Sequence, residues 1–182
     1  LSLLSFIKNG VEEVINFDLN KLLDLNEKIK GGKPKLDYDV AMLTCQCSHV
    51  WCVIDSKINS NGIDHFLLKA FLNNPFTSHL ITELSWEKRV DIPTWLGSLN
   101  TQCVGDIEIK QLISSIVADL KHSEEDMNDI EQLKERLNTM DIPKIGWEIK
   151  ETIDERNPIG MTEIICFELS EKYILLEFHR ES

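Results

Sequence analysis

The chain has 182 residues, of which 42% are hydrophobic and 27% are charged, and its formal net charge at pH 7 is −12. This length and composition argue against a disordered or fibrous chain, and we assign residues 1–182 to a single domain. From Asp106 onward there are 19 acidic and 9 basic residues, so a net charge of −10 lies in the second half. Such a surface repels nucleic acid and anionic lipid and attracts basic proteins.

The cysteines and the hydropathy pattern indicate the compartment. The chain has five cysteines, and Cys45, Cys47 and Cys52 lie close together. A secreted disulfide framework usually spreads an even number of cysteines through a shorter chain. No apolar run approaches the roughly 20 residues that span a bilayer. We therefore expect a cytoplasmic protein without a membrane partner.

The first element predicted along the chain is a helix. Apolar residues recur at three- and four-residue steps from Ile7 to Leu23, which is the spacing of one helical face. Asp18 is a suitable N-cap for a helix that runs to Lys30, and the glycine at Gly31 ends it.

The segment from 38 to 56 is ambiguous. Its apolar spacing fits a helix nearly as well as a strand, but its β-branched residues and Trp51 favour strands. We predict two strands, 38–46 and 50–56, with a turn at 47–49.

The middle of the chain contains a helix, a strand and a short helix in the prediction. Apolar spacing from Ile63 predicts a helix that stops before Asn74. Alternating apolar residues predict a strand at 79–87. Pro93 suits a first helical turn, so 93–100 is predicted as a short helix.

Two helical stripes follow and predict a helical hairpin, 107–121 and 124–140. Ser123, with Asp126 three residues later, resembles a capping box at the start of the second helix.

The final segment, 145–180, alternates in polarity and is divided by turns, which predicts a three-stranded antiparallel meander. Its middle strand is apolar on both faces and is expected to be central. The fold class is therefore α+β, with helices packed on a mostly antiparallel sheet.

Four potential soft-metal ligands, Cys45, Cys47, His49 and Cys52, lie within eight residues. Structural zinc sites usually combine pairs of ligands from two separate segments, whereas these four residues lie in a single segment. In an extended strand Cys52 also points to the face opposite Cys45 and Cys47. We expect no metal and no cofactor, and keep a metal-dependent enzyme or ligand-binding domain at this cluster as the alternative function.

A cysteine hydrolase needs a thiol and a nearby imidazole. The candidate nucleophiles are Cys47 and Cys103, and the candidate bases are His49, His65, His79, His122 and His179. No family signature surrounds either cysteine, and no Gly-x-Ser-x-Gly elbow or phosphate-binding loop occurs. We therefore assign no catalytic residue and expect a protein that is not an enzyme.

The acidic residues around the second predicted helix are the candidate binding surface. Glu124, Glu125, Asp129 and Glu131 crowd its start, where carboxylates also favour the helix dipole. Trp147 follows on a predicted strand, and its ring is either core or an interface anchor. These residues predict a docking surface for a basic protein. By analogy of class, the most concrete such protein is an immunity or antitoxin-type inhibitor that masks a basic toxin such as a nuclease.

Overall fold

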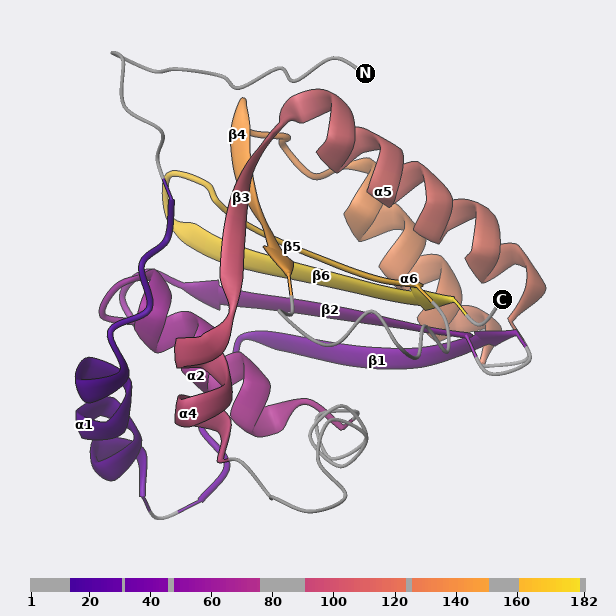
Figure 1. The fold of residues 1–182 in the computed structure, drawn as a ribbon. Coiled ribbons are helices and arrows are strands. Elements are labelled where there is room, and N and C mark those ends of the chain that lie inside the picture. Colours follow the sequence, from indigo (N-terminus) through magenta and orange to yellow (C-terminus); the bar gives the residue numbers. More distant parts are fainter. Residues whose placement is uncertain are drawn as a thin grey trace.

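The computed structural model describes residues 14–30, 32–45, 48–75, 91–123, 126–150 and 161–180. Six strands form one sheet in the order β1-β2-β6-β5-β4-β3, and each neighbouring pair is antiparallel (Figure 1). The strands are β1 (Tyr38–Cys45), β2 (Ser48–Ser56), β3 (Asn100–Gly105), β4 (Ile145–Lys150), β5 (Met161–Glu168) and β6 (Lys172–Arg180). The predicted α+β class and the meander of β4 to β6 are confirmed, with β5 inside the sheet.

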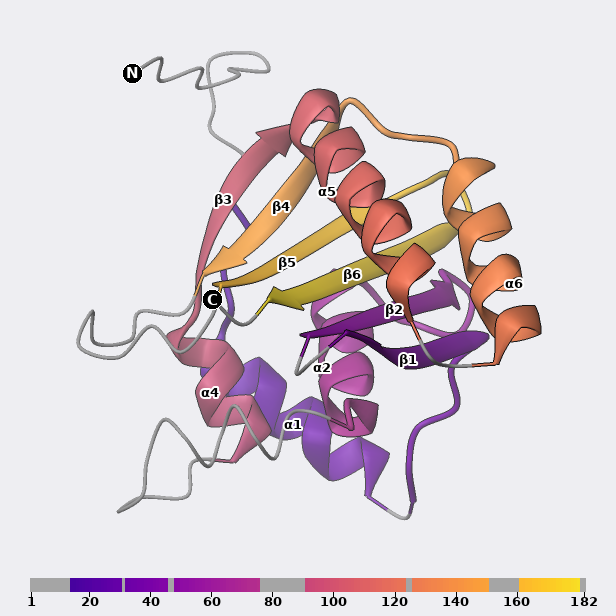
Figure 2. The same cartoon turned by 90° about the vertical axis from the view of Figure 1, so that its right-hand side faces the viewer.

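Helices cover both faces of the sheet, so the molecule has three layers (Figure 2). On one face lie α1 (Leu19–Ile29), α2 (Ile63–Asn73) and α4 (Ile92–Ser98). On the other face lie α5 (Asp106–Asp119), which continues as a 3₁₀ turn (Leu120–His122), and α6 (Met127–Asn138). The predicted helical hairpin is confirmed as α5 and α6.

Aspartates cap three of these helices, α1, α4 and α6. The Asp18 carboxylate accepts a hydrogen bond from the Asn20 amide at 2.9 Å, as the sequence predicted. Asp126 caps α6 by accepting from the Asn128 amide at 2.8 Å. The capping box predicted at Ser123 is wrong, because α6 begins at Met127 with Asp126 as its N-cap. The Ser123 hydroxyl donates to the Leu43 carbonyl at 2.7 Å. Ser123 thereby ties the α5–α6 connection to β1.

Several predicted boundaries move. Ser48 and His49 belong to β2 and not to a turn. The helical stripe does not continue across Asp18, since residues 14–18 precede the helix. The strand β3 was missed, because Asn100–Gly105 is short and polar. The strand predicted at 79–87 lies outside the described residues.

Alternate side chains of β2 point to opposite faces of the sheet, and the sheet separates two hydrophobic cores. Trp51 and Val53 pack with α1, α2 and α4, whereas Val50, Cys52 and Ile54 pack with α5 and α6. We call these sides the α2 face and the α5 face of the sheet.

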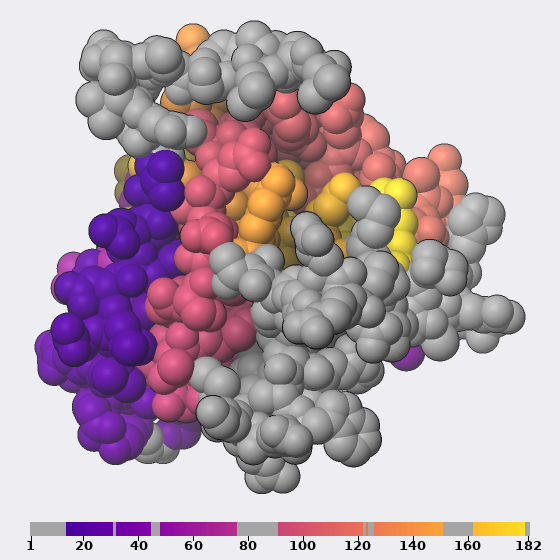
Figure 3. Space-filling view, viewed as in Figure 1, coloured from indigo at the N-terminus to yellow at the C-terminus, as the bar shows by residue number. Residues whose placement is uncertain are grey.

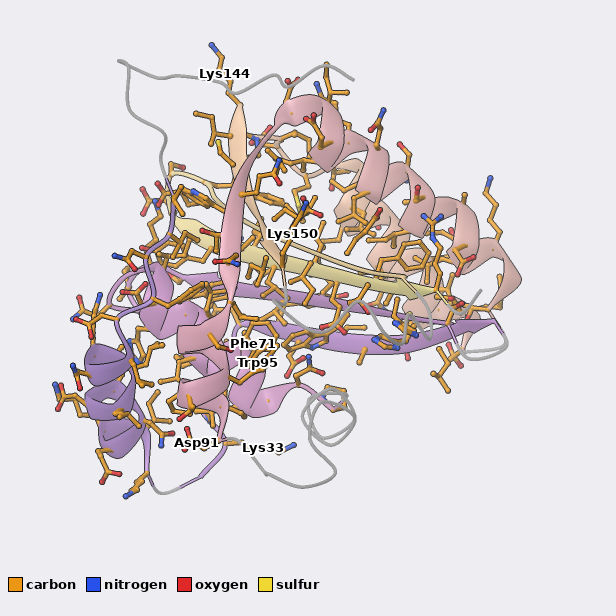
Figure 4. All side chains as sticks on the ribbon, in the orientation of Figure 1. Lys33, Phe71, Asp91, Trp95, Lys144 and Lys150 are labelled. Carbon is orange, nitrogen blue, oxygen red and sulfur yellow. The ribbon has the colours of Figure 1, made fainter. Side chains whose placement is uncertain are left out.

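Close contacts hold the helices of the α2 face together. The Phe71 and Trp95 rings meet edge to face with centroids 4.7 Å apart (Figure 4). A Cβ atom at Gly97 would lie 3.3 Å from the Leu19 Cβ, so glycine allows α4 to approach α1 closely. The surfaces of these two helices lie side by side in Figure 3.

Candidate functional site

The outer face of α6 is acidic. Asp129, Glu131 and Glu135 are exposed, because α6 turns its apolar stripe toward the sheet. That buried stripe consists of Ile130, Leu133 and Leu137. Glu131 forms a surface ion pair with Lys134 at 2.9 Å, an interaction that contributes little to stability. The structure thus exposes Asp129 and Glu131, which leave the helix on different flanks of its buried stripe, while Glu124 and Glu125 lie outside the described residues.

Trp147 lies elsewhere. It pairs with Cys166 across β4 and β5 and packs, partly buried, against the core of the α2 face. Because α6 covers the opposite face, one flat partner surface cannot include both Trp147 and Asp129.

The Cys/His cluster is divided by the sheet. Cys52 is fully buried on the α5 face, and burial raises the pKa of its thiol to about 12, so the thiolate that binds metal is strongly disfavoured. His49 points to the α2 face, where its ring stacks on that of His179. His49 and Cys52 therefore cannot bind one ion together. The side chains of Cys45 and Cys47 lie outside the described part of the chain.

The remaining histidine and cysteine candidates are scattered. His65 accepts a hydrogen bond from the Asn61 amide at 3.0 Å and helps to shape the turn before α2. Burial and then the nearby Lys69 charge lower the pKa of His65, which favours its neutral form. Cys103 lies on β3, partly buried. His79 and the side chain of His122 are not among the described residues.

A polar cluster on the α2 face was missed by the sequence reasoning. Glu177 on β6 is fully buried, and its Oε1 lies 2.8 Å from His49 Nε2 while its Oε2 accepts from Asn74 Nδ2 at 3.0 Å. Next to it, His179 Nδ1 lies 2.8 Å from the hydroxyl of Thr162, which is exposed. Polar groups therefore extend from a buried carboxylate to the surface. The only signal in the sequence was a glutamate inside the apolar run of β6.

The geometry of this Glu177 cluster defines what it can do. The contact with Glu177 fixes the orientation of the His49 imidazole, and a deprotonated carboxylate at this position accepts a hydrogen bond from Nε2–H. The His49 and His179 rings stack with centroids 4.9 Å apart and an interplanar angle of 14°. In-plane nitrogen lone pairs of parallel rings do not converge on one ion.

A second buried carboxylate lies further along the same face. Asp55 is fully buried and accepts hydrogen bonds from Lys69 Nζ at 2.5 Å and from the Ser60 hydroxyl at 2.6 Å. Lys69 Nζ also donates to the Asn59 carbonyl at 3.3 Å. These bonds tie the end of β2 to the turn and to α2, so this Asp55 cluster has a structural role.

Among the residues that the structure describes, no group of three or more His, Cys, Asp or Glu side chains is placed to hold a metal ion. Within the same residues, no helix has both the length and the hydrophobicity needed to cross a bilayer. Comparisons with models of protein families, with curated proteins and with solved structures found no match to this chain.

Proposed function

We propose that this chain is a non-enzymatic binding protein whose partner is a basic protein. The observation that carries the proposal is the exposure of three carboxylates on α6: Asp129, Glu131 and Glu135 all project from a helix fixed by its buried stripe. Carboxylates on a rigid element attract a cationic partner over several ångströms and raise its rate of association. The net charge of −12 extends this attraction over the whole molecule.

The most concrete form of this function is an immunity or antitoxin-type inhibitor. A toxic nuclease carries positive charge to hold phosphates, and an acidic inhibitor can occupy that site by presenting carboxylates in their place. The compartment we propose is the cytoplasm. Cys52 and Cys166 are buried free thiols, which supports a reducing environment.

Association kinetics test this proposal. The partner is first isolated by affinity purification from the native source and then purified by itself. In the test variant, Asp129, Glu131 and Glu135 are replaced by Lys. In the matched control, Lys replaces Asp24, Glu27 and Glu171, which are exposed on α1 and in the β5–β6 turn. Both variants change the net charge by the same amount, so a difference between them reports the docking site and not global charge.

We expect the α6 variant to associate at least about tenfold more slowly at low salt than the control variant, with a weaker dependence on salt. Both should remain folded, because isolated exposed charges contribute little to stability. Equal association rates for the two variants, or a purified partner that is acidic, would contradict the proposal.

A further inference from the structure

A groove runs along the side of α5 that faces away from α6. Its volume is about 760 Å³, within the roughly 300–1,000 Å³ of many ligand sites. In Figure 2, no helix of the described residues covers the ends of β4, β5 and β6 beside α5. Val104, Leu112 and Ile165 are buried and line it, so the groove has an apolar component.

Polar side chains line both walls of this α5 groove. Gln111, Ser114 and Ser115 line it from the helix, and Glu163 and Arg180 line it from the sheet. Among the described residues Glu163 and Arg180 form no ion pair, and the Arg180 guanidinium lies over the Phe178 ring, 4.4 Å from its centroid. By contrast, the neighbouring Glu148 is already paired with Lys150 at 3.1 Å. The Glu163 carboxylate is therefore available to a cation from outside the chain.

A second hollow of about 310 Å³ shares Ser115 and Arg180 with the groove and reaches Asp119. The Oδ2 atom of Asp119 is buried and accepts no hydrogen bond from the described residues. An unsatisfied buried oxygen of this kind is unfavourable, because it has given up its hydrogen bonds to water without replacing them.

The position of Asp119 adds to this cost. It is the final residue of α5, and the last turn of that helix contains no basic residue. A carboxylate there faces the negative end of the helix dipole. Asp119 lines the hollow, so a cationic donor that enters it would lie beside this carboxylate.

We propose that the α5 groove binds an extended polypeptide segment with basic side chains, which pair with Glu163 and Asp119. The apolar lining takes the aliphatic stems of Lys or Arg, and Arg180 donates to a backbone carbonyl of the segment. This inference rests on the proposed function, because it names the part of the basic partner that α5 receives. The groove and α6 lie on opposite sides of α5, so a partner that uses both must extend across that helix.

The probe for this site is the peptide acetyl-Arg-Ala-Arg-Ala-amide, titrated into ¹⁵N-labelled protein at low salt. We expect amide shifts to change at Ser114, Ser115, Asp119 and Glu163. The same peptide with citrulline in place of arginine keeps the shape and loses the charge. It should bind at least about tenfold more weakly.

Two double variants make the assignment specific. Glu163→Gln with Asp119→Asn should weaken peptide binding about tenfold, whereas Glu171→Gln with Asp24→Asn, at exposed positions outside the groove, should not. Thermal melts confirm that both are folded. Shift changes outside the groove, equal affinity for the citrulline peptide, or equal binding by the two variants would overturn the inference.

The outcomes separate the two proposals. If the groove variant binds the peptide as the unmutated chain does while the α6 charge reversal still slows the partner, the groove assignment fails and the proposed function stands. If the peptide binds in the groove but charge reversal on α6 leaves the partner's association rate equal to the control, the proposed function fails instead.

Discussion

The two faces of the sheet are stabilised differently. On the α2 face, the core of aromatic and aliphatic side chains encloses charged groups: Asp55, Lys69 and Glu177 are all buried there. On the α5 face, no described charged residue is buried as a whole, and α5 and α6 pack on the sheet through apolar contacts. The α2 face therefore depends on specific partners, and the α5 face depends on filled volume.

The largest expected effect lies on the α5 face. Phe167 on β5 is fully buried there among aliphatic side chains. Phe167→Ala should lower the free energy of unfolding by about 3–5 kcal/mol, because it removes buried contacts and leaves a cavity. Urea denaturation measures the change. A loss below about 1 kcal/mol would show that this face is not held by packing.

On the α2 face, removing one buried charge should lower the free energy of unfolding nearly as much as removing the Phe167 ring does on the α5 face. Lys69→Met leaves the Asp55 carboxylate buried without its cation and should cost about 3–5 kcal/mol. Combining it with Asp55→Asn should recover part of the loss. The control is Lys28→Met, which breaks the exposed pair with Asp24 and should change stability by less than about 0.5 kcal/mol. A Lys69 variant as stable as this control would refute the contrast between the faces.

A substitution in the Glu177 cluster should destabilise the fold less than a substitution in the Asp55 cluster. In Glu177→Gln, His49 can exchange its ring proton so that Nε2 accepts from the new amide, which an ammonium group cannot do. We expect a cost of about 1–2 kcal/mol, below that of Lys69→Met. A larger loss for Glu177→Gln would mean that the negative charge itself is required.

The smallest effect concerns His65, which lies beside the Asp55 cluster. Burial, reinforced by Lys69, lowers the pKa of His65 in the folded chain, so the unfolded chain binds the proton more readily. Stability from this group is present above about pH 6.5 and is lost as the pH falls through the lower folded pKa. Unfolding measured at pH 7.5 and 5.5 should therefore show a smaller decrease for His65→Gln than for the unmutated chain. An equal decrease in both would remove His65 from the acid response.

The sequence predicted those parts of the molecule whose signal is local. The hairpin of α5 and α6 has long apolar stripes, and the meander of β4 to β6 alternates and is divided by turns. Contacts between distant segments carried no such signal. Glu177 meets His49 across 128 residues and Asn74 across 103, so no spacing rule could join them.

The site residues show the same difference between local signals and contacts across distant segments. The exposure of Asp129 and Glu131 follows from the helical period of α6, because both residues fall outside the buried apolar stripe. The position of Trp147 on the far face depends on how β4 pairs with β5, and one sequence does not specify that register. The groove arises where α5 lies beside a part of the sheet that no described helix covers. The sequence carried no signal for that arrangement either.

The position of β6 has a consequence for how the chain acquires its structure during synthesis. β6 lies between β2 and β5, although it is the strand of the sheet that is made after the other five. Until Lys172–Arg180 leaves the ribosome, the β1–β2 hairpin has no neighbour to join, and the edges of β2 and β5 remain open. Closure of the sheet must then bring together segments made far apart in time, which favours slow folding and exposes the nascent chain to aggregation and to chaperones.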